Sequence, residues 1–211
     1  MTTRPAGLRQ RKKQATREAL RDAALRLALE RGPENVRVDD IAEAAGVSPR
    51  TYNNYFASRE QAMVAAITAE RESRIGAAVA SRPAGVRLAD AVTDAVVEQY
   101  TDPGERAREA MLLVTAHPAL RRAFVGTATA VEHPLADAID DRLGDADPFT
   151  ARVLAASVAA AVQVALERWL QPGGPATTGS LVVPAGSLPD LLRRALAPLA
   201  PALDTAGEPP R

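Results

Sequence analysis

The hydrophobic residues of this 211-residue chain recur at steps of three and four, and this spacing constrains the fold more than any other feature. Such a period places apolar side chains on one face of an α-helix. Ala, Leu, Arg and Glu, which all suit helices, are abundant. Convincing period-two alternation, the mark of a half-buried strand, is missing. The sequence therefore predicts an all-α protein.

Glycine and proline divide this pattern into segments. Gly32-Pro33 ends a first helix that begins near Leu8. Gly126 and Pro134 fall within one later helix, which we expect to be kinked or split. Residues 171–187 are rich in Pro, Gly, Ser and Thr and predict a mobile loop. The predicted helices span 8–31, 38–45, 49–56, 59–79, 87–100, 103–115, 118–143, 148–170 and 188–203.

Two short helices, 38–45 and 49–56, are separated by the tight turn Gly46-Val47-Ser48. Gly46 can adopt the positive φ that such a turn needs, and Ser48 followed by Pro49 is a strong helix start. The small side chain of Ala42 lets the second helix cross closely. Tyr52 and Phe56 are four residues apart and are expected in the core. This is the geometry of a helix-turn-helix.

Exposed hydrogen-bonding side chains gather on the second short helix and just after it. The N-terminal part of such a helix reads base edges in the major groove. The candidate base readers are Arg50, Thr51, Asn53 and Asn54. Tyr55 can reach a phosphate through its hydroxyl, and Arg59 stands at the start of the next helix, where free N–H groups also favour phosphate.

The charge is unevenly spread although the formal net charge is zero. Residues 1–62 hold twelve Arg and Lys against eight Asp and Glu, and the excess is concentrated between Arg4 and Arg21. A basic head suggests a polyanionic partner, and a solvated helix end is the alternative. With the helix-turn-helix, the charge favours duplex DNA, to which the first helix adds general attraction rather than specificity.

Residues 12–62 resemble the TetR family of bacterial regulators. The resemblance lies in Ile-Ala-Glu-Ala-Ala-Gly-Val-Ser and in the later Thr-aromatic-x-x-Tyr-Phe-x-Ser-Arg-Glu run. It implies a homodimer with a DNA-binding domain at 8–58 and an effector-binding and dimerisation domain at 59–211. It also implies that Tyr55 and Arg59 contact the DNA backbone. Asn53 and Arg37 depart from the commoner Tyr and Thr, and Arg37 can bind phosphate with more reach.

The second half resembles family members more loosely, through His117-Pro-Ala-Leu-Arg-Arg and Arg168-Trp169-Leu170. Some relatives of that kind answer to acyl-CoA or other lipophilic effectors, which suggests a small apolar or acyl-type ligand. Ordinary packing is the alternative for every candidate pocket residue. These candidates are Tyr100, Met111, Thr115, His117, Phe124, Thr127, Gln163 and Trp169.

Dimerisation is expected through the helices near 148–170 and 188–203, which are rich in Ala, Val and Leu. Ala155, Ala159, Val162 and Leu166 fall on one stripe, and we expect a monomer to expose a face of one of these helices. Two-fold symmetry would then predict a palindromic operator.

Other classes of function find little support in the sequence. There is no cysteine, a nucleophile elbow and a phosphate-binding glycine loop are missing, and only two histidines occur. We therefore expect neither an enzyme nor a metal or cofactor. An apolar leader is lacking and the stretch 153–166 is short for a membrane span, so a cytoplasmic, membrane-free setting is expected. A regulator without a ligand, or an activator, remains open.

Overall fold

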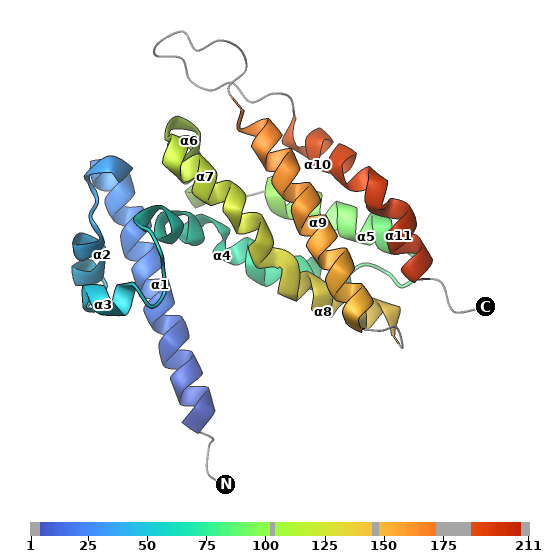
Figure 1. The fold of residues 1–211 in the computed structure, drawn as a ribbon, viewed down its shortest axis with the longest axis horizontal. Helices are drawn as coiled ribbons and strands as arrows, with labels where there is room; N and C mark the ends of the chain where they lie inside the picture. Colours follow the sequence, from blue (N-terminus) through green and yellow to red (C-terminus); the bar gives the residue numbers. More distant parts are fainter. Residues whose placement is uncertain (1–4, 102–103, 145–147, 172–186, 208–211) are drawn as a thin grey trace. The chain divides into compact units, whose positions relative to one another are not determined.

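The computed structural model describes residues 5–101, 104–144, 148–171 and 187–207 (Figure 1). Every regular element among these residues is a helix, which confirms the predicted all-α fold. Most of the predicted loop 171–187 lies outside the described residues. The elements are α1 (Pro5–Arg31), η1 (Pro33–Asn35), α2 (Val38–Ala44), α3 (Pro49–Tyr52), α4 (Arg59–Ala80), α5 (Leu88–Thr101), α6 (Gly104–Ala116), α7 (Pro118–Gly126), η2 (Thr127–Val131), α8 (Glu132–Leu143), α9 (Pro148–Trp169), α10 (Leu188–Leu196), η3 (Ala197–Leu199) and α11 (Ala200–Ala206).

The chain forms two compact units. The first unit contains residues 1–67 and 109–124, and the second contains 68–108 and 125–211. Helix α4 runs without a break through the point where the sequence passes from one unit to the other. The domain boundary expected between residues 58 and 59 stays a prediction.

The core of the first unit forms around the C-terminal half of α1. Leu20 of α1, Ile41 of α2 and Tyr52 of α3 are completely buried. The ring of Tyr52 lies 5.9 Å from that of Phe56, which is also buried, so both aromatic residues are core residues as predicted. Burial of these apolar side chains packs α2 against α1, and α3 packs in turn against α2.

Helix α3 is shorter than the sequence predicts. It ends at Tyr52, and the N–H groups of Asn54 and Tyr55 bond to carbonyls three residues earlier, as in a tight turn. Two consecutive asparagines favour such a turn because their side chains compete for backbone hydrogen bonds. The predicted helix 118–143 is split after Gly126, as its glycine and proline suggest.

In the second unit α9 packs against α8 and α10, and α10 also packs against α5. This arrangement overturns the predicted dimer stripe, because Ala155, Ala159, Val162 and Leu166 are at most 1% exposed within a single chain. The leucines at 188, 192 and 196 are buried as well. The apolar faces of α9 and α10 that carry these residues therefore belong to the core of a single chain.

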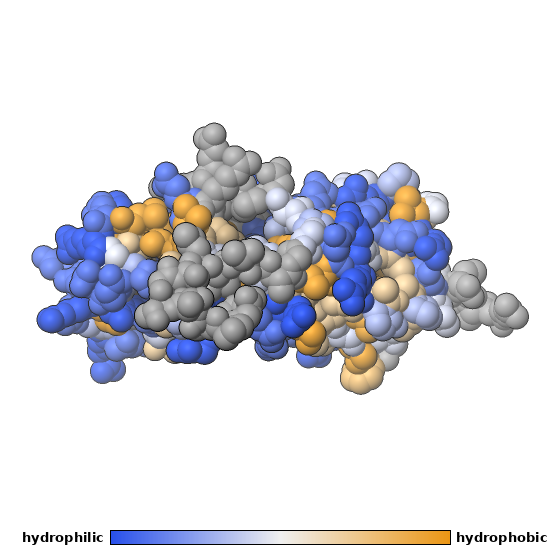
Figure 2. Space-filling model, turned by 90° about the horizontal axis from the view of Figure 1, so that it is seen from above, coloured by the Kyte–Doolittle hydropathy of each residue, from blue (hydrophilic) through white to orange (hydrophobic). Residues whose placement is uncertain are grey.

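A different face of α9 is open to solvent. Phe149, Val153 and Val164 are 68%, 46% and 61% exposed, and Ala156 and Ala160 on the same side are also exposed. Orange patches in Figure 2 show apolar surface between hydrophilic residues. Among the described helices α9 alone has the length and composition of a membrane span, which is weak evidence because a core helix passes the same test.

Gly46 offers a test of the turn before α3. Its φ is +69°, and a Cβ atom added there would meet no atom within 4 Å. Gly46→Ala should therefore lower the free energy of unfolding by about 1 kcal/mol through backbone strain alone. Urea denaturation measures the change.

Gly126 is the matched control, because it has a helical φ of −62° and equally open space for a Cβ. Gly126→Ala should leave stability unchanged or raise it by about 0.4–1 kcal/mol. Equal effects of the two substitutions would contradict the left-handed turn at Gly46.

Candidate DNA-binding site

Backbone and side-chain hydrogen bonds fix how α3 follows α2. The N–H of Val47 donates to the carbonyl of Ala42 at 2.9 Å, and the N–H of Gly46 donates to that of Glu43 at 3.0 Å. The hydroxyl of Ser48 then caps α3 by accepting the N–H of Thr51 at 3.2 Å. The start of α3 is therefore held rigidly, as a helix that enters a DNA groove requires.

The predicted base readers lie at one end of the first unit. Arg50 on α3, and Asn53 and Asn54 just after it, are exposed. Thr51 is half-buried, and its hydroxyl oxygen lies 3.0 Å from that of Ser48, so it belongs to the helix cap as well. The structure thus brings the guanidinium and the two amides together on the surface, where they can donate to and accept from base edges.

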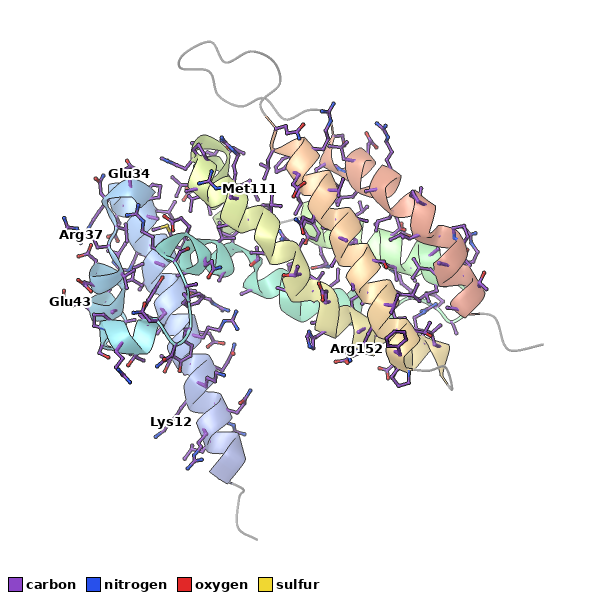
Figure 3. The ribbon with its side chains drawn as sticks, in the orientation of Figure 1. Lys12, Glu34, Arg37, Glu43, Met111 and Arg152 are labelled. Carbon is purple, nitrogen blue, oxygen red and sulfur yellow. The ribbon has the colours of Figure 1, made fainter. Side chains whose placement is uncertain are left out.

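The candidate phosphate anchors Arg37 and Tyr55 flank this set in the sequence. Arg37 caps α2 and is exposed, and its backbone N–H donates to the carboxylate of Asp40 at 2.9 Å. Figure 3 shows Arg37 beside Glu34 on the segment that leads into α2. Tyr55 is half-buried in the turn after α3.

Arg59 makes contacts that sequence reasoning missed. Its Nη1 donates to the carbonyls of Val36 at 2.6 Å and Glu34 at 3.1 Å, while its Nε donates to the carboxylate of Glu60 at 2.9 Å. The start of α4 is therefore tied to the segment before α2. The sequence carried no signal of this, because the main acceptors are backbone carbonyls more than twenty residues away.

The surroundings of Arg59 and Glu60 shift the pKa values of two ionisable side chains. Burial would raise the pKa of Glu60, but hydrogen bonds and the charge of Arg59 outweigh it and lower the pKa below its usual value. Burial, together with the charge of Glu60, raises the pKa of Tyr52 to about 12. The Tyr52 hydroxyl is thus neutral under ordinary conditions, and it donates to the carbonyl of Ser58 at 2.8 Å.

The predicted pocket residues are distributed over both units. Tyr100 and Phe124 are buried, and the other six are half-buried. Four of the eight belong to the first unit (Met111, Thr115, His117 and Phe124) and four to the second (Tyr100, Thr127, Gln163 and Trp169). A ligand pocket lined by them stays a prediction.

Individual contacts add detail to these positions. In the first unit, His117 Nδ1 lies 3.9 Å from the Glu34 carboxylate. In the second unit, the guanidinium of Arg71 lies 3.8 Å from the ring centre of Tyr100 and is only 6% exposed, a buried cation that sequence reasoning missed. A pocket of about 270 Å³ in that unit, beside Arg87, is lined by none of the eight predicted residues.

The sequence matches two family models. Residues 20–66 match bacterial regulatory proteins of the tetR family, and residues 83–204 match the MftR C-terminal domain. The HTH-type transcriptional regulator TcmR from Streptomyces glaucescens is 34% identical over 174 residues, which cover 77% of this chain and 76% of the relative. The chain belongs to the TetR family of transcriptional regulators.

Two further proteins are similar over different extents. The HTH-type transcriptional regulator BetI from Rhizobium meliloti (strain 1021) is 47% identical over 51 residues, 24% of this chain and 25% of the relative. The structure of Thermus thermophilus FadR, a TetR family repressor in complex with lauroyl-CoA, gives 21% identity and a TM-score of 0.49, covering 92% of this chain and 96% of FadR. TetR-family regulators bind DNA and ligands as dimers, and this member is a transcriptional regulator rather than an enzyme.

Arg59→Lys tests the hydrogen bonds that Arg59 donates to the carbonyls of Glu34 and Val36. Lysine keeps the charge but cannot present the fork that reaches two carbonyls. Because the side chain is 34% exposed, we expect the free energy of unfolding to fall by a modest amount, about 1 kcal/mol, in urea titrations.

Arg50→Lys is the control, because Arg50 is exposed and its side chain forms no hydrogen bond or ion pair among the described residues. Its stability should stay within about 0.5 kcal/mol of the wild type. Wild-type stability of Arg59→Lys would show that the tie between α4 and the segment before α2 contributes little.

Proposed function

We propose that this TetR-family regulator is a repressor that binds a palindromic operator as a homodimer and leaves it when a small lipophilic effector binds. The observation that carries the DNA-binding part is the exposed set of Arg50 on α3 and Asn53 and Asn54 just after it, in a short helix whose start is capped by Ser48. We place its action in the cytoplasm, where an operator is accessible.

Each candidate residue has a role in this proposal. Arg50, Thr51, Asn53 and Asn54 read base edges, and Arg37 and Tyr55 hold phosphates on either side. Arg59 acts on DNA mainly by holding the carbonyl of Val36, the residue before Arg37. The two asparagines in the turn set the base preference, because an amide can both donate to and accept from a base.

The homodimer is proposed to form through the exposed face of α9. Val153, Ala156, Ala160 and Val164 follow one another at steps of three and four, opposite the buried stripe of the same helix. Leu191 and Ala195 on α10, which packs against α9, are half-buried and supply further partly exposed apolar surface. An exposed apolar stripe of this length is unfavourable in a monomer, and its small alanines let two α9 helices approach closely.

The effector is proposed to be a small apolar or acyl-type molecule. In the second unit, Tyr100 and Trp169 supply aromatic side chains of the kind that bind such a molecule. In the first unit, the flexible side chain of Met111 is of a kind that adapts to an alkyl chain. The effector need only bind the DNA-free form more tightly than the DNA-bound form.

Selection of bound fragments from the source genome tests the proposed function. Wild-type protein should enrich a palindrome at moderate salt, and the adjacent genes should indicate the effector. Tyr55→Ala should weaken binding to all sequences alike, whereas Asn53→Ala should change which bases are enriched. Absence of any enriched fragment would contradict DNA-binding regulation, and equal effects of both substitutions would contradict the assigned roles.

Val164→Glu tests the dimer face. A charge pushed into an apolar interface on both protomers would be desolvated, so the variant should be monomeric by light scattering and should lose affinity for the palindrome. Its thermal unfolding should stay cooperative because Val164 is 61% exposed in a single chain.

The matched control is Leu112→Glu on α6, which introduces the same charge at a leucine that is 65% exposed. It should remain dimeric. A Val164→Glu protein with the wild-type dissociation constant would exclude this face of α9 as the interface.

A further inference from the structure

The N-terminal half of α1 projects from the packed part of the first unit. Ten of the twelve residues from Leu8 to Ala19 are exposed, and the buried part of α1 begins at Leu20. Figure 1 shows this half running on beyond α3, and Figure 3 places Lys12 on it. We name residues 8–19 the basic arm. At 1.5 Å per residue it is about 18 Å long.

The basic arm holds unpaired positive charge. Its one acid, Glu18, accepts a hydrogen bond from the side chain of Gln14 at 2.9 Å. Arg9, Lys13 and Arg17 follow one another at four-residue steps, and like charges so spaced destabilise a helix. Within the described residues none of the arm's cations forms an ion pair. These cations are Arg9, Arg11, Lys12, Lys13 and Arg17.

The row Arg9, Lys13 and Arg17 continues the buried stripe of α1. The next steps of three and four lead from Arg17 to Leu20 and then to Ala24, both completely buried. The guanidinium of Arg17 lies over the ring of Phe56, 5.8 Å from its centre, in the connection between α3 and α4. One helical stripe is therefore apolar where it packs on the helix-turn-helix and basic where it passes beyond it.

We propose that Arg9 and Lys13, on the face marked by Arg17, bind the phosphates of duplex DNA that flanks the bases contacted by α3. This inference rests on the proposed function. Evenly spaced cations suit the evenly spaced phosphates of a duplex, and about 18 Å of arm spans about five base-pair steps. Arg11 and Lys12, on other sides of the helix, add only general attraction.

The test compares Arg9→Gln/Lys13→Gln with Arg11→Gln/Lys12→Gln, which removes the same charge from the same helix. Glutamine keeps the helix propensity of the arm. The probe is the palindromic fragment enriched from the genome, used with and without six flanking base pairs on each side. Binding is titrated against salt, and protection is mapped with hydroxyl radicals.

The first double variant should bind the long fragment at least tenfold more weakly. Its plot of log affinity against log salt should be shallower by about 0.9 for each cation removed. It should lose protection of about five flanking base pairs per side but keep the centre. Removing the flanks should weaken the wild type and leave this variant unaffected. The second double variant should change each value much less.

A charge-preserving exchange, Arg9→Lys with Lys13→Arg, should keep wild-type values and controls for disturbance of the helix. Failure of the wild type to bind any fragment would overturn the proposed function itself. Normal binding and an unchanged salt dependence in Arg9→Gln/Lys13→Gln would overturn the arm proposal alone. Equal losses in both Gln double variants would reduce the arm to general attraction and overturn the assigned face.

Discussion

Tyr52 is completely buried, and its hydroxyl donates a 2.8 Å hydrogen bond to the carbonyl of Ser58. This one side chain anchors α3 in the core and also fixes the residue that precedes α4. Together with the Ser48 cap, Tyr52 positions the exposed residues that precede and follow it, Arg50 and Asn53. Losing the hydroxyl would leave the part-buried carbonyl of Ser58 without this donor, which costs about 1 kcal/mol. The end of the first unit that carries the candidate DNA-binding residues depends on this contact.

Much of the fold could be predicted because local physics determined it. The turn at Gly46, the cap at Ser48 and the division after Gly126 follow from residues with narrow conformational preferences. The end of α3 at Tyr52 could not be predicted, because continuing the helix to Phe56 satisfies the same apolar spacing. Two consecutive asparagines follow Tyr52, and asparagine is a weak helix former.

The errors and omissions arose where distant segments meet. The stripe Ala155, Ala159, Val162 and Leu166 looks like an interface in the sequence, since spacing identifies an apolar face and not its partner. In the structure this stripe packs within one chain, and the opposite face of α9 is the exposed one. Arg59 shows the same limit, because its partners are the backbone carbonyls of Glu34 and Val36.

Helices α1 and α9 both leave part of their surface exposed in a single chain. Each has more surface than one chain can cover, and the chemistry of the uncovered part differs: cations on the basic arm, and valines and alanines on α9. Exposed cations are well hydrated and attract a polyanion, whereas exposed apolar surface is stabilised by burial against other apolar surface. In the proposals made here, a duplex operator satisfies the first and a second copy of the chain satisfies the second. Two-fold symmetry would then present a pair of arms to the DNA, so that the proposed dimer face and the proposed arms together would determine how much of the duplex is held.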